Sequence, residues 1–218
     1  MKWPTMSEMS ALVPLPAGYC FAELDRAMLP ALIASLRVWH PAISVGVASC
    51  YLSDDFYFSR VVLDGKLDRD VLVVPFTFDG ALAGVWSFER EIDSLALYGR
   101  LIVIAPDHRG AKLSAIAMKG TESLGRAMGV AFLYALATLK FPHIQRALEG
   151  AGYRLLGFFP GYDREEVAPG VVKRVYQAVY AKLLVAEDEV LRPDPRNLTP
   201  RARALYSLLF SDVPAAES

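Results

Sequence analysis

The clearest pattern of apolar and polar positions lies between residues 70 and 185. The segments DVLVVPFTF and ALAGVWSFERE are rich in β-branched and aromatic residues, and they flank Asp79-Gly80. An Asp-Gly pair between two such runs is a strong signal for a tight β-hairpin. The run LALYGRLIVIA predicts a third strand, and AKLSAIAMKGTESLGRAMG places its apolar residues at helical spacing along one face. We therefore expect three strands followed by a helix.

The rest of the chain continues this alternation of elements. VAFLYALATL is apolar on both faces, which predicts a strand in the centre of a sheet. PHIQRALEGAGY predicts a second helix, and RLLGFFPGY and RVYQAVYAKLLV predict two last strands joined by a loop over 163–173. Before residue 70 we expect a short strand in GYCFAELD, a helix in RAMLPALIASLRVWH, an extended segment in AISVGVASCYL and a helix in DDFYFSRVVL.

The order of these elements defines a fold class and a division of the chain. A strand–helix–strand crossover among hairpins predicts an α/β fold of the α+β type, with a mixed, mostly antiparallel sheet of about six to seven strands and flanking helices. We expect one domain over 1–218, made of a surface leader (1–18), a core (19–185) and a linker with a C-terminal helix (186–218). That helix is expected to open at Thr199-Pro200, since proline suits the first helical position.

Composition narrows the function classes. The net charge of −1 argues against a nucleic-acid binder, which needs a basic excess to neutralise phosphates. No apolar run reaches the roughly 18 residues that suggest a membrane span, and the N-terminus has no signal-like apolar region. Two cysteines are too few for a disulfide framework, so we expect a cytoplasmic protein. A hydrophobic fraction of 54% is slightly high and suggests a homodimer contact.

The turn after the third strand is a candidate anion site. In IVIAPDHRGAKLSAIAMKG the strand stops at Pro106 and a helix follows Gly110. Backbone N–H groups at a helix start lack partners and carry partial positive charge, so an anion can dock there. Arg109 and Lys112 add formal positive charge, and glycine lets a ligand approach the backbone. The alternative is an ordinary turn capped by Asp107 with solvated basic side chains.

The surroundings of this turn resemble the GCN5-related N-acetyltransferase family. The resemblance rests on IVIAPDHRGAKLSAIAM, the preceding GALAGVWSF and the continuation VAFLYALATLKFPHIQRALEGAGYRLLGFFPG, and it spans roughly Asp70 to Leu184. The family pattern is Gln or Arg, two residues, Gly, one residue, then Gly or Ala. Here Asp107 and Lys112 replace the first and last positions, while the central Arg-Gly pair is kept. Ser114 also replaces a glycine often found two residues further on.

The resemblance implies an acyl-CoA-dependent N-acetyltransferase that uses acetyl-CoA as co-substrate. In the family the pantetheine arm lies between the fourth and fifth strands, and the pyrophosphate sits on the amides that open the next helix. On this sequence the resemblance assigns cofactor binding to the following residues: Val103, Ile104, Ala105, Arg109, Gly110, Ala111, Lys112, Leu113, Ser114 and Thr138. The partners it implies are acyl-CoA and a small amine.

The groups that would move protons are less clear. The family often carries a tyrosine acid five residues before the aromatic residue at 153, and here that position is Leu148. Glu89 and Glu91, two apart on one strand face, are candidates for the base or for holding a cationic amine; the alternative is a solvated strand end. His143 at a helix start is a third candidate base, or else an ordinary surface histidine.

Other readings of the site stay open. Arg100 could receive an anionic substrate. Three scattered histidines at 40, 108 and 143, with no acid or cysteine at ligand spacing, argue against a metal site. Two competing functions remain, namely a non-catalytic acyl-CoA-binding module and a ligand-free structural subunit of an oligomer. Acceptor specificity would come from residues 40–70 and the loop over 160–173.

Overall fold

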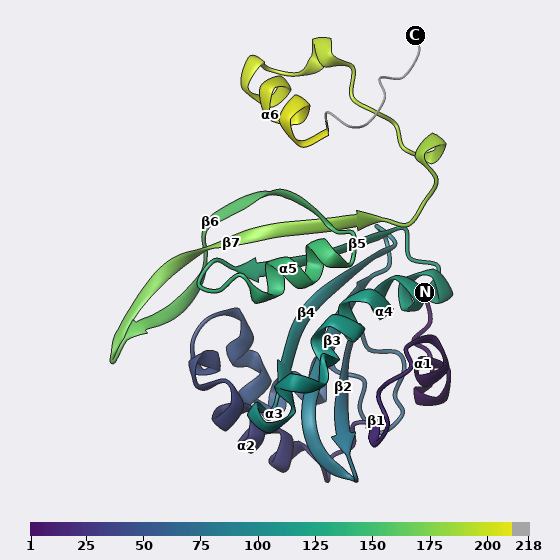
Figure 1. The fold of residues 1–218 in the computed structure, drawn as a ribbon, viewed down its shortest axis with the longest axis vertical. Coiled ribbons are helices and arrows are strands. Elements are labelled where there is room, and N and C mark those ends of the chain that lie inside the picture. Colours follow the sequence, from purple (N-terminus) through teal and green to yellow (C-terminus); the bar gives the residue numbers. More distant parts are fainter. Residues whose placement is uncertain (211–218) are drawn as a thin grey trace. The chain divides into compact units, whose positions relative to one another are not determined.

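The computed structural model describes residues 1–210 and divides the chain into two compact units, Met1–Leu184 and Val185–Ser218 (Figure 1). The second unit holds two short 3-10 helices, Glu187–Glu189 and Pro195–Asn197, and the helix α6 (Pro200–Phe210). Thr199 accepts a hydrogen bond from the Ala202 amide, which confirms the predicted helix start. The last part of the predicted 186–218 segment, residues 211–218, lies outside the described residues.

The first unit is built on one seven-stranded sheet. Its order is β1-β2-β3-β4-β5-β7-β6, with β4 and β5 parallel and the other neighbours antiparallel. The predicted mixed, mostly antiparallel sheet is thus confirmed. The strands are β1 (Tyr19–Phe21), β2 (Val71–Phe78), β3 (Ala81–Glu91), β4 (Ala96–Ile104), β5 (Phe132–Thr138), β6 (Arg154–Ala168) and β7 (Val171–Leu183).

Local sequence explains the β2–β3 hairpin. Asp79 and Gly80 both have positive φ, 48° and 83°, as a tight two-residue hairpin turn requires. A glycine adopts this backbone without strain, and aspartate tolerates it better than most residues. The hairpin predicted from the Asp-Gly signal is therefore confirmed.

Helices cover both faces of the sheet (Figure 1). One core contains buried residues of α1 (Met6–Leu12), α4 (Leu113–Met128) and α5 (His143–Gly150), packed on one sheet face around Trp86 and Leu97. A second core contains buried residues of α2 (Leu29–Trp39) and α3 (Asp54–Arg60), packed on the opposite face around Val85. Because both faces are covered, the central strands are apolar on both sides.

The segment 1–18 is more than a surface leader. It contains the helix α1, which Thr5 caps by accepting from the Glu8 amide at 3.2 Å. Met9 and Val13 are buried, and a Cβ added at Gly120 of α4 would lie 2.4 Å from a Val13 methyl carbon. The expected leader therefore contains a helix whose outer side is exposed, while two of its apolar side chains, four residues apart, belong to the core.

Two further expectations about local structure are wrong. The segment 42–52, expected to be extended, forms 3-10 helices η1 (Pro41–Ser44) and η2 (Val47–Leu52). It is held by the buried Tyr51 and by the Asp163 carboxylate, which accepts from the Val47 amide at 2.8 Å. The loop expected over 163–173 is instead a continuation of β6 and β7, which turn only at Gly170, with φ 71°.

Candidate functional site

The site begins where the parallel strands β4 and β5 separate. They are paired only from Ala96 with Phe132 to Gly99 with Ala135. Beyond Gly99, β4 remains paired with β3 up to Ile104, while β5 remains paired with β7 up to Thr138. A cavity of about 390 Å³ opens in this gap. Backbone groups on the facing edges of the two strands are therefore left for another partner.

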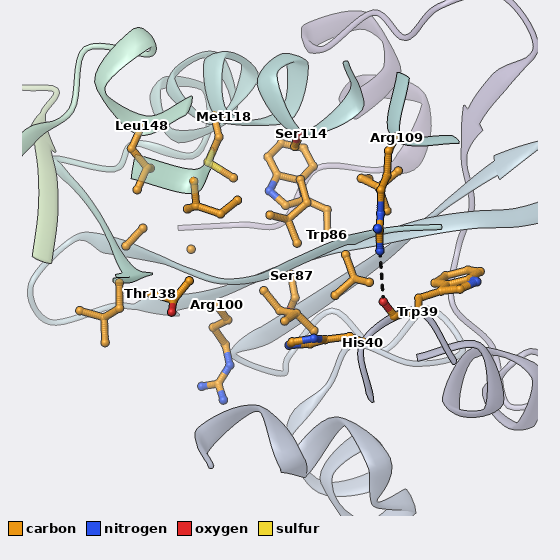
Figure 2. A pocket seen from close by; sticks show the side chains of 18 residues that line it. Trp39, His40, Trp86, Ser87, Arg100, Arg109, Ser114, Met118, Thr138 and Leu148 are labelled. Atoms are coloured by element: carbon orange, nitrogen blue, oxygen red, sulfur yellow. Dashed lines mark hydrogen bonds between the residues drawn. The ribbon is translucent and has the colours of Figure 1, made fainter. Parts of the chain in front are cut away.

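The cavity reaches from one helical layer to the other (Figure 2). Ser114 and Met118 of α4 and Leu148 of α5 line one end. His40, which follows α2, and Arg100 of β4 belong to the other end. The cavity wall therefore combines residues that lie on opposite faces of the sheet.

The turn before α4 leaves the helix start uncapped. It forms the 3-10 helix η3 (Pro106–Ala111), and then Lys112 adopts a left-handed conformation with φ 57° and ψ 19°. No side chain caps α4, and the Ile116 amide donates to the Lys112 carbonyl at 3.0 Å. The backbone N–H groups of the first turn, before Ile116, therefore have no acceptor within the helix. The turn falls at Lys112 and not at Gly110, whose φ is not positive.

The expected cofactor-binding residues form two groups. The cavity wall includes Val103, Ile104, Arg109, Ser114 and Thr138. The remaining expected residues lie in or beside the turn and outside the wall: Ala105, Gly110, Ala111, Lys112 and Leu113.

Arg109 and His108 connect the turn to other elements. The Arg109 guanidinium donates to the Trp39 carbonyl at 3.4 Å, as the dashed line in Figure 2 shows. His108 is half-buried. Its Nδ1 lies 2.8 Å from the Tyr19 hydroxyl, and the two rings meet edge to face. These contacts tie η3 to the end of α2 and to β1, so the turn is held from both sides.

The three expected catalytic residues lie outside the cavity wall. Glu89 forms ion pairs with Arg60 and with Arg100. Glu91 is exposed and accepts hydrogen bonds from Tyr134 and Ser94. His143 is the exposed first residue of α5.

His40 is the cavity residue that the sequence did not single out. Among the described residues that line the wall, the titratable side chains are His40, Arg100 and Arg109, and arginine does not give up its proton in proteins. Burial lowers the pKa of His40 below its usual 6.5, with Glu165 opposing and Lys140 and Arg109 adding to the shift. His40 is therefore the wall side chain that can accept a proton near neutral pH.

Leu148 occupies the position where the family often carries a tyrosine. It is fully buried and lines the cavity from α5. The count back from Tyr153 thus leads to a residue of the cavity wall, but a leucine cannot donate a proton.

Within residues 1–210 we find neither a cluster of metal ligands nor a membrane-spanning helix. Nowhere in this range do three or more His, Cys, Asp or Glu side chains gather in a way that could hold a metal ion. None of the helices in the same range combines the length and apolar character of a membrane span.

Comparison with known proteins identifies the fold. No protein-family model matches the sequence, and no curated protein matches it either. Solved structures do match. Spermidine N-acetyltransferase from Vibrio cholerae, in complex with CoA and spermine, has a TM-score of 0.61 at 12% identity, covering 77% of this chain and 96% of that one.

Two further matches agree with this result. The ribosomal L7/L12 alpha-N-protein acetyltransferase RimL, in complex with coenzyme A, has a TM-score of 0.58 at 11% identity over 78% of this chain and 97% of its own. An acetyltransferase of the GNAT family from Bacillus anthracis has a TM-score of 0.55 at 13% identity, over 76% and 94%. The chain therefore has the GCN5-related N-acetyltransferase fold, and the resemblance seen in the sequence is confirmed at that level.

Proposed function

We propose that this protein is an acyl-CoA-dependent N-acetyltransferase that moves an acetyl group from acetyl-CoA directly to the amine of a small molecule. The observation that carries the proposal is the gap between β4 and β5, which opens a cavity of about 390 Å³ beside the uncapped start of α4. Solved structures of the same fold include complexes with CoA and with acetyl-CoA.

The residues present suit an acyl-CoA ligand. The pantetheine arm carries amide groups, and the unpaired edge of β4 from Arg100 to Ile104 offers backbone donors and acceptors to them. The diphosphate suits the uncapped amides at the start of α4, beside the Lys112 and Arg109 side chains. In this arrangement the thioester lies in the gap, and the acceptor amine enters from the side of His40.

The reaction needs one proton acceptor and no oxidant or reductant. The amine lone pair attacks the thioester carbonyl carbon, and the carbonyl electron pair moves onto oxygen. The amine proton passes to His40, which burial keeps neutral. When the carbonyl re-forms, the C–S bond breaks, and the thiolate takes a proton from the imidazolium or from water. Positioning within the gap supplies much of the acceleration, because the thioester is already activated.

A non-catalytic acyl-CoA-binding module is the second candidate. Leu148 favours it, because this buried residue replaces the tyrosine that commonly serves as acid in the family. The same cavity would then hold acyl-CoA without turnover.

We also propose a homodimer, since apolar side chains such as Phe158 and Tyr176 are exposed on the β6–β7 hairpin.

The first test is acetyl-CoA binding, measured by calorimetry for the wild type and the variants Gly110→Asp and Gly110→Asn. A Cβ at Gly110 would meet nothing within 4 Å, and its φ is not positive, so both variants are expected to fold. A carboxylate about 6 Å from the diphosphate costs about 3 kcal/mol at an effective dielectric constant near 20. Screening reduces this, so we expect at least a tenfold loss of affinity for the aspartate variant and less than threefold for asparagine.

The outcomes separate the candidate functions. No wild-type binding at millimolar acetyl-CoA would overturn both acyl-CoA functions. Equal affinity of the two Gly110 variants for acetyl-CoA would show that the diphosphate does not bind at this turn. The second measurement is release of free CoA thiol with a panel of amines that includes spermine, free amino acids and short peptides. Binding without any thiol release would favour the non-catalytic module.

A further inference from the structure

A serine hydroxyl lies in the cavity wall close to the point where β4 and β5 separate. Ser87 of β3 is paired with Leu101 of β4, two residues past the last position that β4 shares with β5. Ser87 lines the cavity, although its solvent exposure is 0%. Its hydroxyl is therefore shielded from bulk water, and a hydrogen bond that it makes is stronger than one made in solvent.

A chain of hydrogen bonds leads to this hydroxyl from the half-buried Arg100 guanidinium. The Tyr51 hydroxyl lies 2.7 Å from Ser87 Oγ, and Arg100 Nε lies 3.3 Å from the Tyr51 hydroxyl. Arg100 is the extra residue of a β-bulge, because the β3–β4 pairing passes from Leu101 to Gly99 without it. A bulge re-aims a side chain, and here Arg100 also forms an ion pair with Glu89.

Which group donates in each of these hydrogen bonds follows from the donors available. A guanidinium only donates, so the Tyr51 oxygen accepts from Arg100. Tyr51 is buried, and its single hydrogen has Ser87 as its one acceptor within residues 1–210. Ser87 Oγ therefore accepts a hydrogen bond from the Tyr51 hydroxyl, and the hydroxyl hydrogen of Ser87 itself is still free to be donated. No other group within that range accepts this hydrogen, which leaves the cavity as the place where it can find a partner.

We propose that the Ser87 hydroxyl donates a hydrogen bond to the carbonyl oxygen of the acyl thioester and stabilises the negative charge that develops on it. Tyr51 and Arg100 are positioning residues, which fix the direction of the Ser87 O–H bond and polarise it. This inference rests on the proposed acetyl transfer and names one further group that acts in it. Each link in this series, from Arg100 through Tyr51 to Ser87, donates toward the cavity, so the group presented there is an O–H donor that suits an oxyanion and not an ammonium group.

The step balances without any further reactant. As the amine attacks, the carbonyl electron pair moves onto oxygen, and the Ser87 proton stays on Ser87 while its hydrogen bond shortens. When the intermediate collapses, the same pair re-forms the carbonyl, and the C–S bond electrons leave with the thiolate. Ser87 thus lowers the barrier without exchanging a proton, which leaves proton acceptance to His40.

The test is a double-mutant cycle on the full chain with Ser87→Ala, Tyr51→Phe and the double variant. Thiol release from acetyl-CoA gives kcat, with the amine of the panel that works best, or with water as acceptor. Calorimetry gives the acetyl-CoA Kd. Tyr180→Phe is a matched control, because it removes another buried tyrosine hydroxyl, one that donates to Glu149 outside the cavity.

We expect Ser87→Ala to lower kcat about 100-fold, as the loss of one oxyanion donor does. Tyr51→Phe should lower it about tenfold, since the serine remains but is no longer oriented. The double variant should match Ser87→Ala within twofold, because the two residues act as one relay. The Kd of acetyl-CoA should stay within twofold throughout, and Tyr180→Phe should keep the wild-type kcat.

The melting temperature gives a readout that does not depend on the reaction. Ser87→Ala leaves the buried Tyr51 hydrogen without an acceptor, so adding Tyr51→Phe should restore part of the lost stability. Wild-type kcat in folded Ser87→Ala, or losses that multiply in the double variant, would overturn the role of Ser87 while acetyl transfer stands. A wild-type protein that releases no thiol with any acceptor would overturn the proposed function, and the role of Ser87 with it.

Discussion

Replacing His40 by glutamine tests whether this residue accepts the amine proton. Glutamine keeps polarity and similar length but does not titrate near neutral pH. The charged groups that influence His40 come from three elements: Glu165 from β6, Lys140 from the segment after β5 and Arg109 from η3. Burial outweighs the opposing effect of Glu165, so the pKa lies below 6.5. The wild type therefore holds a neutral imidazole at pH 7 and above.

The expected effect has a size and a pH window. Loss of a general base lowers the rate by about 10²-fold or more, which corresponds to about 2.7 kcal/mol in the barrier. In the wild type, kcat/KM should rise with pH through the lowered pKa of His40 and then level. The variant should lack this rise. The acceptor amine adds its own dependence to both proteins, so the difference between the two profiles isolates His40.

The same pKa shift predicts a change in stability with a definite sign. The unfolded chain has the higher His40 pKa and binds more protons than the folded chain between the two values. Stability is therefore fully present above about pH 6.5 and is lost as the pH falls through the folded-state pKa. The melting temperature of the wild type should fall more on acidification than that of His40→Gln.

The assay is thiol release from pH 5 to 8.5 for both proteins, with melting curves in the same buffers. A His40→Gln variant that keeps both the rise in kcat/KM and the wild-type rate would refute the assignment of His40 as base. If the variant is slower but its kcat/KM still rises with pH as in the wild type, the group that titrates is another residue.

Two further predictions concern residues near the site. Lys112→Gly should be more stable than Lys112→Ala by about 1 kcal/mol, a difference of roughly 2–4 °C in melting temperature, because position 112 is left-handed; equal melting temperatures would contradict the assigned backbone. Glu89→Gln should lower the melting temperature, since the carboxylate pairs with Arg60 and Arg100, while the His40 rise in kcat/KM is unchanged. If kcat/KM of Glu89→Gln does not rise with pH, Glu89 and not His40 would be the base.

The parts of the fold that the sequence predicts are those fixed by neighbouring residues. The β2–β3 hairpin follows from Asp79-Gly80, whose positive φ values are a local property of these two residues. The helix α4 follows from apolar spacing along one segment. By contrast, the 3-10 helices over 41–52 depend on the burial of Tyr51 and on Asp163, more than 110 residues away. No local pattern contains that information.

The candidate site shows the same division. The turn before α4 is visible in the sequence because strand end, cations and helix start are consecutive. His40 and Ser87 are not visible, since each looks ordinary in its own segment. The fold brings them to one cavity from the end of α2 and the middle of β3. Val13 is a different case, because its spacing of four from Met9 was a signal that a helix with one buried side precedes the first strand.

The arrangement of the strands explains why function gathers at one place in this fold. β4 stays with β3, and β5 stays with β7, so the sheet divides where their shared pairing ends at Gly99. A divided sheet exposes backbone donors and acceptors inside the protein, and these require a partner. A peptide-like ligand satisfies them as a neighbouring strand would. The same division places the start of α4 on one side of the cavity and His40 and Ser87 on the other, so that under the proposed function a thioester in the gap would meet all three.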